Sequence, residues 1–80
     1  MKIQEKIINE INHRFYRHAL GDFDEQSIYN FVTNYLIHHG NIIPDNFDFA
    51  VYDNGDYYDI KAMNKESEIF LNQNFTSNLK

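Results

Sequence analysis

Residues 47–62 constrain the fold of this chain more than any other stretch. They contain the dipeptide Asn54-Gly55 between two segments in which apolar and polar residues alternate. Asn and Gly both tolerate positive φ angles, which a two-residue type I′ turn requires at both of its central positions. The stretch therefore predicts a β-hairpin, with strands at about 47–53 and 56–62 and a two-residue turn at its tip.

A two-residue turn also fixes which residues of the two strands face each other. It places Tyr52 opposite Tyr57, and Asp48 opposite Lys61. Side chains alternate between the two faces of a strand, so this pairing sorts the residues by polarity. The mostly apolar face consists of Phe47, Phe49, Val51, Tyr58, Ile60 and Ala62. The outer, mostly polar face consists of Asp48, Ala50, Tyr52, Tyr57, Asp59 and Lys61, with Asp53 and Asp56 at the tip.

Two helices are predicted before the hairpin. Apolar residues at the i, i+4, i+8 spacing predict a first helix over residues 2–19, followed by Gly21. Its apolar stripe consists of Ile3, Ile7, Ile8, Ile11 and Phe15. A second helix is predicted over about 23–39, with Asp22 as its N-cap and Gly40 as the residue that ends it. Its broad apolar face consists of Ile28, Tyr29, Phe31, Val32, Tyr35, Leu36 and His39.

The remaining segment predicts the architecture of the whole chain. Asn64 has the character of an N-cap, and we predict a short helix over about 65–74. Its apolar residues do not fall on one stripe, so an edge strand remains the alternative. An isolated hairpin is only marginally stable in water, so helices must cover its apolar face. We therefore predict a small single α+β domain of order α-α-β-β-α, with an antiparallel helix pair packed on a two-stranded β-hairpin.

Charge is distributed unevenly along the 80 residues. The formal net charge is −5, and residues 21–60 contain eight acidic residues but no Lys or Arg. This half of the chain is therefore unsuited to nucleic acid, because phosphate contacts need cations. The first helix carries Lys2, Lys6, Arg14 and Arg17, which leaves direct nucleic-acid binding through that helix as one alternative.

The sequence gives little support to a metal, cofactor or catalytic site. The chain has no cysteine, and its four histidines (His13, His18, His38 and His39) lack the spacing of helical metal ligands. The tip offers carboxylates and a glycine but not the pattern of a calcium loop, which leaves only a weak surface Ca²⁺ site as an alternative to simple turn chemistry. There is no glycine-rich phosphate loop and no nucleophile motif. We predict a protein that is not an enzyme and that needs no cofactor.

The outer face of the hairpin is the strongest functional signal. Its candidate partner-binding residues are Asp48, Tyr52, Asp53, Asp56, Tyr57 and Asp59. Tyrosine is enriched in protein interfaces, and spaced carboxylates attract a basic groove. The competing interpretation is a solvated polar face without a partner. The functional interpretation predicts a small acidic protein that docks on a larger basic protein, such as a nuclease or another nucleic-acid-binding protein, and inhibits it.

Small phage-encoded inhibitors of host defence nucleases, such as anti-CRISPR proteins, are similar in size and charge, although no sequence motif ties this chain to them.

The chain has no apolar run long enough to span a membrane and no signal-peptide pattern. We therefore expect it in the cytosol of a bacterium or of an infected host cell. We expect a monomer or a homodimer. A homodimeric structural or regulatory module, built on an apolar helix surface or a free hairpin edge, is the second alternative.

Overall fold

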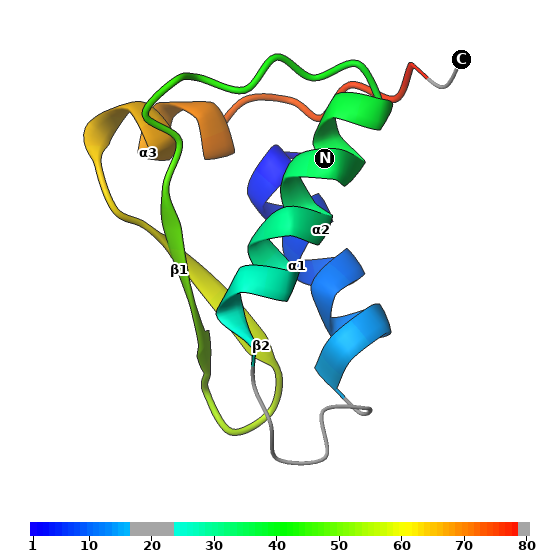
Figure 1. The fold of residues 1–80 in the computed structure, drawn as a ribbon, viewed down its shortest axis with the longest axis vertical. Coiled ribbons are helices and arrows are strands. Elements are labelled where there is room, and N and C mark those ends of the chain that lie inside the picture. Colours follow the sequence, from blue (N-terminus) through cyan, green and yellow to red (C-terminus); the bar gives the residue numbers. More distant parts are fainter. Residues whose placement is uncertain (17–23, 79–80) are drawn as a thin grey trace.

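The computed structural model describes residues 1–16 and 24–78. In chain order its elements are α1 (Ile3–Ile11), a π-helical segment (Asn12–Tyr16), α2 (Glu25–His38), β1 (Phe49–Asp53), β2 (Tyr58–Ala62) and α3 (Lys65–Leu71). Helices α1 and α2 run in opposite directions, the hairpin lies beside them, and α3 lies at the end of the hairpin away from its tip (Figure 1). The predicted α+β architecture and its element order are confirmed.

The first helix is regular only at its start. Its N-terminus forms a capping arrangement in which the Lys2 backbone N–H donates to Glu5 Oε1 at 3.0 Å. The α-helical part ends at Ile11, and the next five residues form the π-helical segment. The predicted helix over 2–19 is therefore partly correct. Its last residues lie outside the described part of the chain, as do His18 and Gly21.

The second helix begins and ends at residues with clear local chemistry. Asp24 is the N-cap, because its Oδ1 accepts hydrogen bonds from the backbone N–H groups of Gln26 and Ser27 at 3.1 and 3.4 Å. Asp22, the predicted N-cap, lies outside the described residues, and the helix begins at Glu25 rather than at about residue 23.

The C-terminus of α2 confirms the role predicted for Gly40. This residue has φ = +90°. Its N–H donates to the Ile37 carbonyl, and the Asn41 N–H donates to the Leu36 carbonyl, both at 2.9 Å. These are the two bonds of a Schellman motif, which requires a left-handed residue at this position.

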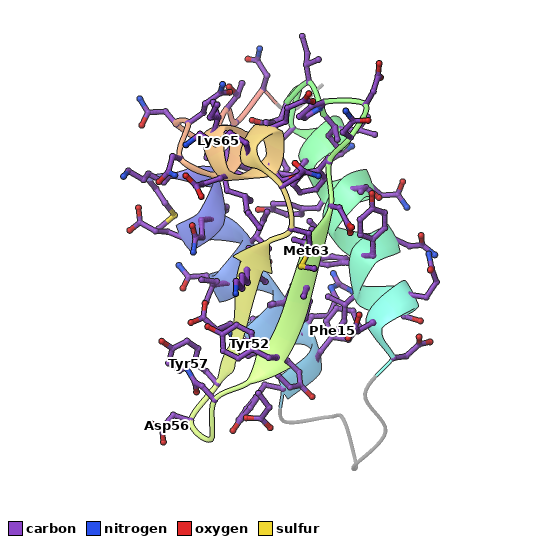
Figure 2. All side chains as sticks on the ribbon, turned by 90° about the vertical axis from the view of Figure 1, so that its left-hand side faces the viewer. Phe15, Tyr52, Asp56, Tyr57, Met63 and Lys65 are labelled. Carbon is purple, nitrogen blue, oxygen red and sulfur yellow. The ribbon has the colours of Figure 1, made fainter. Side chains whose placement is uncertain are left out.

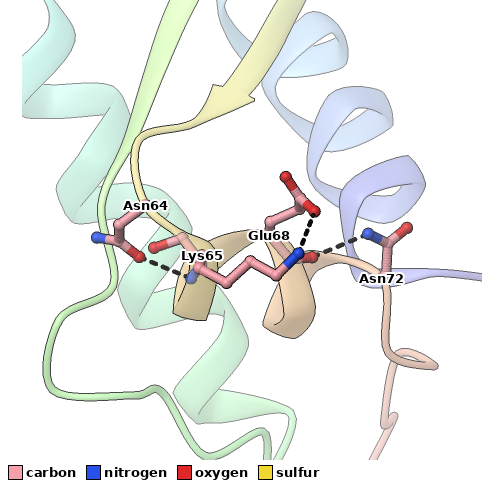
Figure 3. A network of polar contacts seen from close by, with 5 residues as sticks. Asn64, Lys65, Glu68 and Asn72 are labelled. Carbon is pink, nitrogen blue, oxygen red and sulfur yellow. Dashed lines mark hydrogen bonds and ion pairs between the residues drawn. The ribbon is translucent and has the colours of Figure 1, made fainter.

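The third helix is a helix and not an edge strand. Asn64 Oδ1 accepts from the Ser67 backbone N–H at 2.8 Å, which confirms the predicted N-cap. On the exposed side, Lys65 pairs with Glu68 at 3.5 Å, and Asn72 Nδ2 donates to the Glu68 carbonyl at 2.9 Å (Figure 3). The helix ends at Leu71, three residues before the predicted end.

All elements contribute to one hydrophobic core. Its buried members are Ile3, Ile7 and Ile11 of α1; Ile28, Val32 and Leu36 of α2; Phe47, Phe49, Val51, Tyr58 and Ile60 of the hairpin and its approach; and Phe70 and Leu71 of α3. Tyr29 stacks on Phe49 at 5.3 Å between ring centroids and so joins α2 to the sheet. The described helices thus cover the inner face of the hairpin and leave its other face open.

Gly40 and Gly55 have similar backbone angles but different surroundings, so the same substitution at both tests the packing around Gly40. Gly40 (φ +90°) has Asn78 Cβ at 3.0 Å from the position of an added Cβ, whereas Gly55 (φ +100°) has nothing within 4 Å. A left-handed conformation costs a non-glycine residue about 1–2 kcal/mol. We expect Gly55→Ala to lower the free energy of unfolding by about that amount and Gly40→Ala to lower it further, as measured by urea unfolding. Equal losses would show that the segment at Asn78 does not pack against Gly40.

Candidate functional site

The tip of the hairpin differs from the predicted turn. Asp53 opposes Tyr58, so residues 54–57 form a four-residue loop rather than a two-residue turn. A type I′ turn at Asn54-Gly55 would need a positive φ at both residues. Gly55 has a positive φ, but no described non-glycine residue does, so the predicted type I′ turn is wrong.

Side chains hold the loop instead. Asn54 Oδ1 accepts from the backbone N–H groups of Asp56 and Tyr57 at 3.0 Å each, and Asp53 Oδ1 accepts from Gly55 N–H at 2.8 Å. Asn and Asp form such turns with their own backbone readily.

The longer loop moves the strand pairing by two residues. Tyr52 opposes Asp59, and Lys61 opposes Ala50. The predicted pairs of Tyr52 with Tyr57 and of Asp48 with Lys61 are therefore wrong, and the strands begin at residues 49 and 58 rather than 47 and 56. A shift of two leaves every residue on its original face. The predicted inner face is confirmed, since its residues are buried, with Ala62 partly so.

Asn12 of the π-helical segment attaches the hairpin to the first helix. Its Oδ1 accepts from the Tyr58 backbone N–H at 2.6 Å, and its Nδ2 donates to the Tyr58 carbonyl at 2.8 Å. This amide therefore pairs with the free edge of β2 as a neighbouring strand would. Four residues further on, Tyr16 Oη donates to the Gly55 carbonyl at 3.2 Å and its ring meets that of Tyr58 edge-on. Sequence periodicity did not reveal Asn12, because its partner is remote in the sequence.

The outer face of the hairpin is open in the described part of the molecule. Tyr52 is 46% exposed and Tyr57 42%, as expected from the sequence. Asp48, Asp53 and Asp56 are exposed, and Asp59 is half-buried. Figure 2 shows Asp56 and Tyr57 at the tip, Tyr52 beside Tyr57 but further from the tip, and Met63 toward the other end of the hairpin. Met63, which is 56% exposed, extends this face and was not among the predicted site residues.

The predicted site residues thus fall into three positions on the hairpin. Asp53, Asp56 and Tyr57 lie at the tip, while Tyr52 and Asp59 form a cross-strand pair in which Tyr52 Oη donates to Asp59 Oδ2 at 3.1 Å. Asp48 lies at the far end, where its backbone N–H donates to the buried Ser67 Oγ at 2.8 Å. We name the exposed surface formed by Asp48, Tyr52, Asp53, Asp56, Tyr57 and Asp59 the acidic face.

The pair of Tyr52 and Asp59 gives a pH-dependent signature of this arrangement. The hydrogen bond to Asp59, with a smaller effect of desolvation, raises the pKa of the Tyr52 phenol above its ordinary value. The stability that the pair contributes is therefore present below the tyrosine pKa of the unfolded chain, and it is lost as pH rises through the folded-state value. We expect Asp59→Asn to lower the pKa of Tyr52 in an NMR titration of its ring. An unchanged pKa would mean that the two side chains do not meet in solution.

The residues on which the alternative functions depend make other contacts in the structure. Lys6 pairs with Glu10 at 3.7 Å, and the Arg14 guanidinium lies 4.6 Å from the centre of the Phe31 ring. Arg17 lies outside the described residues. At the tip, Asp53 Oδ1 and Asn54 Oδ1 accept backbone hydrogen bonds, as expected of simple turn chemistry.

The described residues form neither a metal-binding cluster nor a membrane-spanning helix. Within residues 1–16 and 24–78, no group of three or more His, Asp or Glu residues is arranged to hold a metal ion. The same part of the chain contains no helix of sufficient length and apolarity to cross a membrane.

In comparisons with protein-family models, curated proteins and solved structures, nothing matches this chain. Function is therefore inferred from the chemistry of the acidic face.

Proposed function

We propose that this chain is a small non-catalytic binding protein that docks its acidic face on a basic surface of a larger protein. One observation carries the proposal: the outer side of the hairpin is left open by the described helices, and it displays two exposed tyrosines among four aspartates. Lys61 is the only cation within residues 48–61. A surface of this composition complements a positively charged one.

The tyrosines give this surface more than charge. Tyr52 and Tyr57 each expose close to half of their area while the hairpin backbone beneath them is fixed by core packing. Large amphipathic rings on a fixed backbone lose little conformational entropy on binding, which suits them to anchor an interface. The surrounding carboxylates contribute attraction over distance and therefore association rate.

A nucleic-acid-binding protein is the proposed class of target. Its groove binds regularly spaced negative charges, and the aspartates along the hairpin supply such charges without phosphate. Occupying that groove would inhibit the target. A phage-encoded inhibitor of a host nuclease, of the anti-CRISPR kind, is the form of this proposal that fits the size and charge of the chain. The proposed compartment is the cytosol of the bacterium or infected host in which such a target acts.

The test is capture followed by competition. Immobilised protein is incubated with a lysate of the source or of its host, and bound proteins are eluted with double-stranded DNA at low salt. We expect basic nucleic-acid-binding proteins to be captured and to be released by the DNA. Captured proteins that remain bound in the presence of DNA, or an absence of basic proteins among them, would contradict the proposal.

A further inference from the structure

The outward edge of β1 carries backbone groups without a partner among the described residues. Hydrogen bonds from Met63 N–H to the Asp48 carbonyl and from Asn54 N–H to the Tyr57 carbonyl, both 3.1 Å, mark the two ends of the ladder. In an antiparallel pair the bonded positions alternate, so residues 50 and 52 bond to β2. Phe49 and Val51 therefore direct their backbone N–H and C=O groups away from β2.

The two edges of the sheet differ in their hydrogen-bond partners. On β2, Asn12 supplies the hydrogen bonds of a neighbouring strand, as described above. On the β1 side, Tyr29 Oη donates to the Phe47 carbonyl at 3.0 Å, just before the strand begins. Beyond that point, the described residues offer no hydrogen bond to the outward groups of Phe49 and Val51. An edge of this kind is a template for a further strand.

A cavity lies along this edge. It has a volume of about 240 Å³ and is lined by Glu25, Gln26, Tyr29, Asp48, Phe49 and Val51. The side chains of Phe49 and Val51 are buried in the core, so these residues present mainly backbone to the cavity. The first turn of α2 forms the opposite wall through Glu25 and Gln26.

The charges around the cavity define what would enter it. Glu25 and Asp48, both exposed, are the two charged residues of its lining, and both are acidic. Neither forms an ion pair with a Lys or Arg among the described residues, and residues 21–60 contain no Lys or Arg. We propose that this cavity accepts an extended, lysine- or arginine-rich peptide segment of a partner protein, which adds to β1 as a third strand through Phe49 and Val51. This inference rests on the proposed function, since it assigns a segment of the basic partner to a second contact beside the acidic face.

The test uses a defined peptide rather than an unidentified partner. A seven-residue peptide of alternating lysine and valine, blocked at both ends, is titrated into the ¹⁵N-labelled protein and followed by NMR. We expect the amide signals of Phe49 and Val51 to shift and their hydrogen exchange to slow at least tenfold. A peptide with proline in place of valine keeps the charge but loses the N–H of every second residue, and proline within it is not compatible with a regular paired strand. A peptide with glutamate in place of lysine keeps the donors but reverses the charge. We expect neither control peptide to protect these amides.

Three altered proteins distinguish binding at the β1 edge from binding elsewhere on the surface. Glu25→Lys reverses the charge on one wall of the cavity, at a position outside the acidic face. We expect it to weaken peptide binding at least tenfold. Glu66→Lys, an equal charge change at an exposed position of α3, should change the affinity less than twofold. A chemically synthesised chain with an ester in place of the Val51 amide loses the outward donor but keeps its side chain, and it should also bind at least tenfold more weakly.

The outcomes distinguish this inference from the proposed function. Unchanged exchange at Phe49 and Val51, or full peptide affinity in both the Glu25→Lys and the ester forms, would overturn the strand-addition inference. If the peptide instead shifted only the signals of Tyr52 and Tyr57, this inference would fail while the acidic face would retain its support. Failure of the proposed function is measured separately, by partner capture that persists after the acidic face is neutralised.

Discussion

Replacing Asp48, Asp53, Asp56 and Asp59 together by asparagine is expected to weaken capture of the basic partner at least tenfold while the fold persists. Asparagine is the informative substitution because two of these aspartates also have local roles. Asp53 Oδ1 accepts from Gly55 N–H in the tip loop, and Asp59 Oδ1 accepts from Ile60 N–H. An amide oxygen can still accept these bonds, so the substitution removes charge and leaves the hairpin. Affinity is measured for the captured partner by surface plasmon resonance over a range of salt concentrations.

A matched variant controls for net charge. Glu5, Asp45, Glu66 and Glu68 are exposed carboxylates outside the acidic face, and changing them to glutamine or asparagine alters the net charge by the same amount. We expect this control to bind within about threefold of the unaltered protein and to show the same salt dependence. If both variants lose affinity equally, the overall charge of the chain governs binding and the acidic face is not the site.

Asn12→Ala is expected to lower the free energy of unfolding by about 2–3 kcal/mol. The substitution removes two hydrogen bonds between the first helix and Tyr58, each contributing roughly 1 kcal/mol, together with the packing of the amide in a half-buried position. An 80-residue domain is stabilised by only about 4–12 kcal/mol in total, so the loss is a large share. Urea unfolding followed by circular dichroism measures it.

Asn9→Ala serves as the control for this prediction. Asn9 lies three residues earlier, within α1, and is exposed, so it undergoes the same change of side chain while the contact of Asn12 with β2 is kept. We expect it to be neutral or slightly stabilising. A loss for Asn12→Ala no larger than that for Asn9→Ala would show that the Asn12 amide does not hold the strand edge in solution.

Features governed by local chemistry were predictable from the sequence. The apolar spacing of Ile3, Ile7 and Ile11 identifies the buried side of the first helix. Residue type and position identify Asn64 as the N-cap of α3 and Gly40 as the residue that ends α2. The two faces of the hairpin were also correct, although the pairing was not. The face on which a residue lies changes only if the register shifts by an odd number of residues, and this shift is even.

The length of the tip loop was not predictable because an Asn-Gly dipeptide suits two different turns. Asn-Gly favours a two-residue turn through its backbone, but the Asn side chain can instead bond the backbone two and three residues further on. In this chain the side chain of Asn54 makes the latter bonds, and Asp53 adds a further one. Both solutions suit the same dipeptide, so the sequence alone did not discriminate between a two-residue and a four-residue loop.

Two asparagines were missed because their partners are distant in the sequence. Asn12 bonds a residue 46 positions away, and Asn41 bonds the backbone of Thr76, 35 positions away, through both its Oδ1 and its Nδ2. Asn12 is not part of the apolar stripe of the first helix, and Asn41 lies between the predicted second helix and the predicted hairpin. An asparagine that completes the backbone hydrogen bonding of a remote segment has the same local sequence context as one that faces solvent.

Hydrogen–deuterium exchange of this chain, alone and bound to its captured basic partner, tests the central claim most directly. Because the acidic face is the proposed docking surface, we expect slowed exchange over residues 48–61 and unchanged exchange at the exposed ends of α1 and α3. Slowed exchange confined to α1, with residues 48–61 exchanging as they do in the free protein, would contradict the account.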